Sequence, residues 1–239
     1  MAGFASEPAP AVEAAIFDLD GVIVDTAKYH YMAWKRLANE LGFDFSPKDN
    51  ERLKGVSRMR SLEILLEIAG LRLDEHSKAE LAEKKNQWYI EYISTISPAE
   101  ILSGVPEFIG GLRKLGVKTA LASASKNAPT ILGNLGIASL FDAIVDGNAV
   151  SMAKPNPEVF LVAAGRLGAD PRRCIVFEDA EAGVEAAHRA GMYAVGVGSP
   201  DVLRHADHVI PGFAGLDPAA ILELAQRRRT PRCTPHCQV

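Results

Sequence analysis

The chain has 239 residues, of which 48% are hydrophobic and 23% charged, a composition typical of soluble globular proteins with a core of ordinary size. Its formal net charge of −4 argues against a nucleic-acid binder, which would carry an excess of Lys and Arg. No apolar run reaches the roughly 18 residues that a membrane-spanning helix needs, and the first dozen residues lack a signal-peptide pattern. We therefore expect a cytoplasmic protein that binds neither nucleic acid nor membranes.

Short β-rich segments alternate with helical patterns along much of the chain. The expected strands are residues 14–18, 117–123, 143–146, 174–179, 193–197 and 207–210. The segments between the later strands carry apolar residues at three- and four-residue spacing and end near glycine, as amphipathic helices do. Strands that alternate with helices predict right-handed βαβ units. The expected fold is α/β, with a Rossmann-like parallel sheet as its core.

The first two expected strands are separated by nearly a hundred residues, too many for a single crossover helix. Residues from about 27 to 96 instead carry one helical pattern after another, beginning with AKYHYMAWKRLANELG, which ends at Gly42. We predict an all-helical cap domain over residues 27–96, inserted into a core of residues 1–26 and 97–239. Because two short connections join the cap to the core, it can move as a lid.

The last residues, from about 227, have a composition unlike the rest of the chain and are expected to be disordered. Cys233 and Cys237 flank His236 there, but no second ligand pair stands at zinc spacing, so a frayed tail is favoured over a metal site. Cys174 begins the apolar run CIVF and is expected in the core. This use of cysteine fits a reducing compartment.

Polar residues follow the ends of four expected strands, where ligands bind in parallel α/β sheets. In chain order they are Asp18 and Asp20, then Ser123, then Lys154, and finally Glu178 with Asp179. Four crowded carboxylates would repel one another strongly without a cation, and ligation by oxygen alone suits Mg²⁺. The serine hydroxyl and the lysine charge suit a phosphoryl group.

A carboxylate can attack phosphorus and form an aspartyl phosphate, which gives the Asp18–Asp20 pair a chemical reason. Each motif also has a structural explanation when it is taken alone. The two aspartates could form a turn, KPNP could begin a helix, Glu178-Asp179 could cap one, and His30 could be a packing residue. Their joint order at four strand ends favours a catalytic site.

On DLDGVIVDT (residues 18–26), Ser123, Lys154 and Glu178-Asp179, the chain resembles the haloacid dehalogenase-like superfamily of phosphoryl-transfer enzymes. The resemblance implies that Asp18 is the nucleophile and Asp20 the general acid and base. It implies a Mg²⁺ site formed by Asp18, Asp20, Glu178 and Asp179, and a helical cap after the first motif. Members often carry Ser after the Glu-Asp pair, where this chain has Ala180.

Within the superfamily, LKGVSR (53–58), KKN (84–86), ALASASKN (120–127) and TAKYHYMAWK (26–35) are most similar to a group of sugar-phosphate mutases. The resemblance implies interconversion of β-D-glucose 1-phosphate and glucose 6-phosphate through an aspartyl-phosphate enzyme and β-glucose 1,6-bisphosphate. It implies that Arg58 holds the distal phosphate and that Lys154-Pro155 is a cis peptide bond. The other implied phosphate- and substrate-binding residues are Ser123, Ala124, Lys154, Thr26, His30, Trp34, Lys54, Gly55, Lys85, Asn86, Ser125 and Asn127.

The main alternative is a Mg-dependent sugar-phosphate phosphatase of the same superfamily, in which water rather than a sugar hydroxyl receives the phosphoryl group. A halide-releasing dehalogenase is disfavoured because the acidic groups suit a metal and a phosphate. A catalytically silent binding module is disfavoured because all the catalytic side chains are present. The expected partners are small-molecule sugar phosphates, and a monomer is expected.

Overall fold

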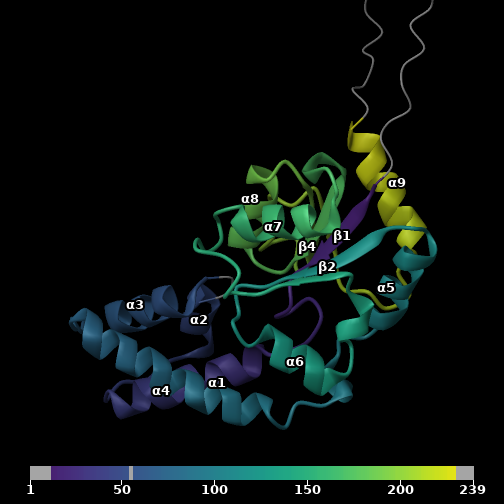
Figure 1. Cartoon of the computed structure of the whole chain (residues 1–239). Helices are drawn as coiled ribbons and strands as arrows, with labels where there is room; N and C mark the ends of the chain where they lie inside the picture. Colours follow the sequence, from purple (N-terminus) through teal and green to yellow (C-terminus); the bar gives the residue numbers. More distant parts are fainter. Residues whose placement is uncertain (1–11, 54–55, 230–239) are drawn as a thin grey trace, which may run out of the picture.

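Six short strands form one parallel sheet, in the order β3-β2-β1-β4-β5-β6 (Figure 1). The computed structural model describes residues 12–53 and 56–229. The strands are β1 (Ala14–Phe17), β2 (Lys118–Ala122), β3 (Ala143–Val145), β4 (Cys174–Glu178), β5 (Tyr193–Val197) and β6 (His208–Ile210). The strand order reverses between β1 and β4, which is where open α/β sheets bind their ligands. The predicted parallel core is confirmed, with strand ends that differ by a residue or two.

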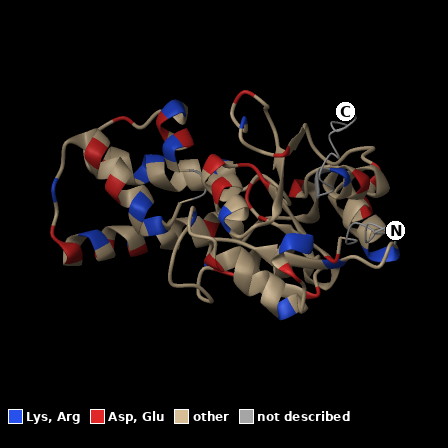
Figure 2. Ribbon diagram, turned by 90° about the horizontal axis from the view of Figure 1, so that it is seen from above, with Lys and Arg blue, Asp and Glu red and all other residues tan. Residues whose placement is uncertain are grey.

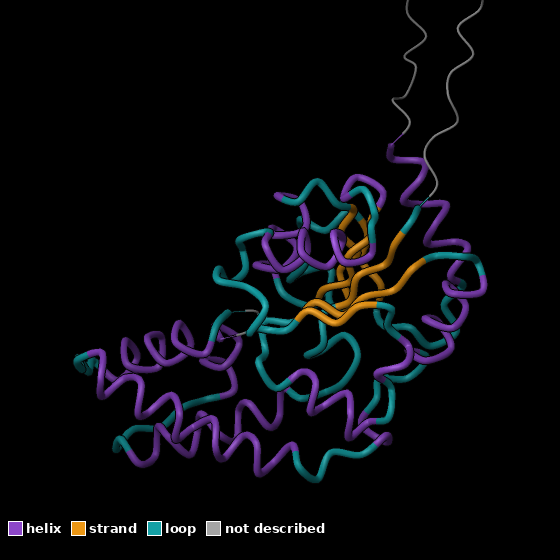
Figure 3. The backbone as a smooth tube through the Cα atoms, viewed as in Figure 1, coloured by secondary structure: helices purple, strands orange, loops and turns teal. Residues whose placement is uncertain are grey.

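Helices cover both faces of the sheet (Figures 1 and 3). Side chains of β1 alternate between two cores, so that Ile16 packs toward α7 and α8 while Phe17 packs toward α5, α6 and α9. The Phe17 ring stacks on Phe177 of β4, with ring centroids 4.7 Å apart. These helices are α5 (Val105–Lys114), α6 (Ala128–Leu135), α7 (Glu158–Leu167), α8 (Glu181–Arg189) and α9 (Pro218–Arg229), with 3-10 turns η2 (Pro98–Glu100), η3 (Ala138–Leu140) and η4 (Pro171–Arg173). Because both faces are covered, β1 is completely buried.

A lobe made of helices follows β1 in the chain and lies beyond the carboxyl ends of the strands (Figure 1). It comprises α1 (Ala27–Glu40), α2 (Pro47–Asn50), η1 (Glu51–Leu53), α3 (Arg58–Ala69) and α4 (Glu75–Ile93). α4 packs against both α1 and α3, and the buried stripe of α1 includes Trp34 and Leu37, as its spacing predicts. Side chains of Ser57 and Asp74 accept backbone N–H bonds at the starts of α3 and α4. The helical insertion is confirmed, whereas its limits at 27 and 96 stay a prediction.

The two connections between the lobe and the core run side by side. Val24 pairs antiparallel with Ile101, and the N–H of Leu102 donates to the carbonyl of Ile23 at 2.9 Å. The hydroxyl of Tyr29, in the first turn of α1, donates to the Glu100 carboxylate on the second connection. The connections are therefore tied to each other close to where the first strand ends.

The C-terminal part of the chain requires one correction. Residues 227–229 form the last turn of α9, although the sequence places the beginning of a disordered tail there. Cys233, His236 and Cys237 lie outside the described residues. Cys174 is buried in the core, as predicted. Over the part of the chain that the structure describes, no helix has both the length and the apolar character needed to cross a bilayer.

Candidate active site

Three carboxylates meet where the strand order reverses. Asp18 directly follows β1, and its N–H donates to the carbonyl of Phe177 on β4 at 3.0 Å, so the ends of the two strands are in register. Asp18, Glu178 and Asp179 each offer a carboxylate oxygen, and these oxygens all lie within 4.8 Å of one another. Such proximity of negative charges requires compensation.

Lys154 supplies part of that compensation from the loop after β3. Its Nζ donates to Oδ1 of Asp18 at 2.6 Å and to Oε1 of Glu178 at 2.7 Å, and all three side chains are buried. The bond between Lys154 and Pro155 is cis, which confirms the prediction from the sequence. The ammonium group therefore lies between a carboxylate of β1 and one of β4.

Burial and the neighbouring charges shift the protonation equilibria of this group. Burial raises the pKa of Asp18 to about 7; Lys154 opposes this rise, whereas Glu178 and Asp20 add to it. Burial alone would lower the pKa of Lys154, but Asp18 and Glu178 outweigh it and raise that pKa above its usual value. Lys154 is therefore a cation at every pH at which the protein would work.

The chemistry of the donors fits a hard divalent cation. Asp18, Glu178 and Asp179 offer only oxygen, and with Lys154 they carry a net charge of −2 when ionised. Asp20, the fourth metal ligand predicted from the sequence, does not join these oxygens. Its carboxylate accepts the hydroxyl of the buried Thr26 instead, because the chain turns away from β1 after Asp18.

The loop after β2 forms the neighbouring wall of the site. Ser123 is fully buried, and its Oγ accepts the N–H of Ser125 at 3.0 Å. The Oγ of Ser125 in turn accepts the N–H of Asn127 at 3.2 Å, at the start of α6. These bonds hold the loop in the tight form that suits an anion.

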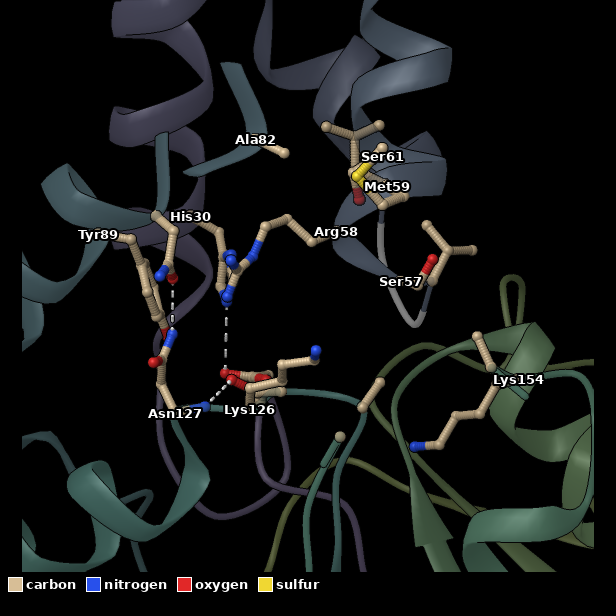
Figure 4. A pocket seen from close by; sticks show the side chains of 18 of the residues that line it. His30, Ser57, Arg58, Met59, Ser61, Ala82, Tyr89, Lys126, Asn127 and Lys154 are labelled. Carbon is tan, nitrogen blue, oxygen red and sulfur yellow. Dashed lines mark hydrogen bonds and ion pairs between the residues drawn. The ribbon is translucent and has the colours of Figure 1, made fainter. Parts of the chain in front are cut away.

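A cavity of about 580 Å³ separates this edge of the sheet from the helical lobe (Figure 4). It brings together twelve of the residues predicted from the sequence: Asp18, Asp20, His30, Trp34, Arg58, Lys85, Asn86, Ala124, Ser125, Asn127, Lys154 and Asp179. Three more, Thr26, Ser123 and Glu178, are buried but do not line the cavity. Lys54 and Gly55 lie outside the described residues.

Arg58 and Asn86 come to the cavity from the lobe. Arg58 begins α3, and its Nη1 lies 3.3 Å from Oε2 of Glu83 on α4. Asn86 on α4 accepts a bond from Nδ2 of Asn127 at 3.0 Å, which joins the lobe directly to the loop after β2. The cavity is thus bridged by a polar contact between two residues that the sequence assigned to substrate binding.

Lys85 occupies an unusual place for a lysine, with only 2% of its surface exposed. Its Nζ lies 3.1 Å from Nδ1 of His30 and above the rings of Trp34 and Tyr89. Burial, with Arg58 adding to it, lowers the pKa of Lys85 to about 7. Burial also lowers the pKa of His30 well below its usual value. With Lys85 donating to Nδ1, the hydrogen of the neutral ring is on Nε2, 3.9 Å from Oδ1 of Asp20.

Several residues that line the cavity are not predicted as site residues from the sequence. They include Asn50, Ser57, Met59, Glu83, Tyr89 and Met152. Tyr89 lies one helical turn after Lys85 on α4, so helical spacing could have found it. Asn50 closes α2 and has no such signal in the sequence. Among the described residues, Oδ1 of Asn50 and the hydroxyl of Tyr89 are buried and find no hydrogen-bond partner.

These features define a class of protein, in which a parallel α/β core carries an acidic site at the strand reversal beneath an inserted helical lobe. The model of the haloacid dehalogenase-like hydrolase family matches residues 12–191. The chain therefore belongs to the haloacid dehalogenase-like hydrolase family. This confirms the family resemblance seen in the sequence.

Individual relatives refine this placement. β-Phosphoglucomutase of Bacillus subtilis is 44% identical over 201 residues, which are 83% of this chain and 89% of that protein. A fructose-1-phosphate phosphatase of Escherichia coli is 35% identical over 182 residues, 76% of this chain and 94% of that protein. The crystal structure of β-phosphoglucomutase from Clostridium difficile superimposes with a TM-score of 0.87 at 42% identity, covering 91% of this chain and 98% of that one.

The buried ammonium of Lys85 leads to a prediction about stability and pH. Because its pKa is about 7 in the folded chain and 10.5 in the unfolded chain, the unfolded state binds more protons between these values. The lysine's destabilising effect is therefore complete below pH 7 and declines as the pH rises toward 10.5. Lys85→Met should unfold at higher denaturant concentration than the parent at pH 7, and its advantage should shrink by at most about 1.4 kcal/mol per pH unit above that.

Chemical denaturation of parent and variant at several pH values between 6 and about 10 measures this difference. Lys84→Met replaces the exposed lysine that directly precedes Lys85 on α4. This variant is the matched control and should show no such trend. A constant difference between Lys85→Met and the parent across this range would contradict the prediction.

Proposed function

We propose that this protein acts as a β-phosphoglucomutase, interconverting β-D-glucose 1-phosphate and glucose 6-phosphate through β-glucose 1,6-bisphosphate. One observation carries the proposal: a single cavity has two separate cationic groups for phosphate. Lys154 lies among the carboxylates of the sheet, and Arg58 reaches the cavity from the helical lobe on a different side (Figure 4). A substrate that becomes a bisphosphate needs both positions. The similarity of most of the chain to the β-phosphoglucomutases of Bacillus subtilis and Clostridium difficile supports this assignment.

In the first half-reaction, Asp18 attacks the phosphorus atom of the bisphosphate. A bond forms between its carboxylate oxygen and phosphorus, and the bond from phosphorus to the sugar oxygen breaks. The departing sugar oxygen takes a proton from Asp20, whose pKa is raised by burial and therefore suits a proton donor. Thr26 and His30 hold the Asp20 carboxylate toward the site.

Asp18, Glu178 and Asp179 would hold Mg²⁺, which supplies positive charge to the phosphoryl oxygens when bound. Lys154 stabilises the same oxygens and orients Asp18, and the Ser123 hydroxyl and the N–H groups of its loop bind them from the other side. In the second half-reaction the other hydroxyl of the sugar attacks the aspartyl phosphate, while Asp20 accepts its proton.

The lobe decides which acceptor is used. Basic and acidic side chains are interspersed over its helices (Figure 2), so the second phosphate is bound by particular groups rather than by a general positive field. The guanidinium of Arg58 binds phosphate through two parallel bonds and keeps its charge. Binding there holds the lobe over the sugar and excludes water, as a mutase requires. A phosphatase would leave water as the acceptor.

The product separates the two functions. With β-glucose 1-phosphate, Mg²⁺ and a trace of β-glucose 1,6-bisphosphate, the parent should yield glucose 6-phosphate, and stoichiometric release of inorganic phosphate would instead establish a phosphatase.

Asp18→Asn should lower turnover by several orders of magnitude while the protein remains folded, because an amide cannot form the acyl phosphate. Asp25→Asn, at an exposed carboxylate of the same segment, should leave turnover unchanged. Activity of Asp18→Asn within tenfold of the parent would exclude Asp18 as the nucleophile.

Arg58→Ala tests the second phosphate position. The variant should lose at least about a hundredfold in kcat/KM for glucose phosphates, because remote binding energy no longer aligns the sugar hydroxyl. Phosphorylation of Asp18 by acetyl phosphate, which is too small to reach Arg58, should change little. Arg60→Ala, at a residue of the same helix whose guanidinium pairs with Glu63 and Glu67, is the control and should behave as the parent. Equal losses on both substrates would contradict a role specific to the distal phosphate.

A further inference from the structure

Gly183 is placed where a glycine has a cost. It lies within the first turn of α8, is buried, and has ordinary helical backbone angles. Glycine is a less favourable helix former than alanine. Its presence in α8 therefore needs a reason outside the backbone of the helix.

The side chain of Glu178 supplies that reason. A Cβ added at Gly183 would approach three atoms of the Glu178 side chain, Oε1, Cδ and Cγ, to less than 3.0 Å. The carboxylate cannot move aside freely, because Oε1 accepts from Lys154 at 2.7 Å and Oε2 accepts from the N–H of Ala180 at 2.9 Å. The Glu178 carboxylate therefore packs directly against the backbone of α8 at Gly183.

The other carboxylate of the pair has a similar neighbour. A Cβ at Gly21, in the turn after β1, would also lie closer than 3.0 Å to the carboxylate of Asp179. Gly21 additionally has a φ of +79°, so its backbone alone favours glycine. At Gly183 no such backbone requirement exists, and the space for Glu178 is the remaining explanation.

We infer that Gly183 is a positioning residue for the acidic site: the absence of its side chain lets the Glu178 carboxylate lie within 4.8 Å of the oxygens of Asp18 and Asp179 and bond to Lys154. The inference rests on the proposed Mg²⁺-dependent function. It predicts that one added methyl group on α8 changes metal binding by displacing the Glu178 side chain. Gly183 does not line the cavity.

Calorimetric titration of the metal-free protein with MgCl₂ tests this without any turnover. Gly183→Ala should weaken Mg²⁺ binding by about tenfold or more, as changes behind metal ligands do. Gly165→Ala, in the last turn of α7 where an added Cβ meets nothing within 4 Å, is the matched control. It should keep the parent's affinity and unfold at the same or a higher temperature. Unchanged affinity in Gly183→Ala would overturn the inference and leave the mutase assignment intact.

A thermodynamic cycle keeps the test decisive if Gly183→Ala folds poorly. Glu178→Ala removes the side chain that the new methyl group would meet, so Gly183→Ala should cost stability in the parent but little or none in the Glu178→Ala background. This measurement is made on the metal-free chain by denaturation. An equal loss of stability in both backgrounds would mean that the methyl group destabilises α8 independently of Glu178, and the inference would be wrong. Failure of the parent to form glucose 6-phosphate would count against the proposed function and leave the cycle unaffected.

Discussion

The ion pairs between Lys154 and the carboxylates of Asp18 and Glu178 are the interaction on which the site depends. Buried ionised groups are tolerated only when partners satisfy them, and here one ammonium group binds carboxylates of two adjacent strands. With Asp179 included, the cluster keeps an excess of negative charge that a divalent cation can balance. In the proposed reaction the same arrangement would bind phosphate, because a bound cation and Lys154 would together present positive charge at the end of the sheet.

The helical lobe turns this charged edge into an enclosed cavity. Its two connections are bonded to each other beside β1, and the bond from Asn127 to Asn86 joins α4 to the loop after β2. The lobe also contributes Lys85 and His30. Burial lowers the pKa of Lys85 to about 7 and that of His30 well below its usual value, so neither side chain is fully protonated at neutral pH. Besides the exposed Lys126, the cavity is lined by Lys154 and Arg58, the two groups that the proposed mutase reaction assigns to its two phosphates.

Much of the fold could be predicted because it follows from local patterns. The later amphipathic helices and the long helical stretch after residue 26 follow from periodicity, whereas the apolar run before Asp18 has no period and is typical of a buried strand by its length. The order of polar residues at strand ends placed Asp18, Lys154 and Glu178 together, since parallel strands end at one edge. The cis bond before Pro155 came from family resemblance and not from any such pattern.

Which side chains touch one another was decided only by the tertiary structure. The sequence alone determined that Asp20 stands two residues after Asp18, but the turn that follows aims its carboxylate at Thr26 rather than at the carboxylates of Asp18, Glu178 and Asp179. Likewise, nothing in the sequence near Asn50 or Gly183 indicates the cavity or the Glu178 carboxylate beside it. Local periodicity selects an element and its buried face, whereas these contacts depend on how close helices and loops distant in sequence approach when they pack.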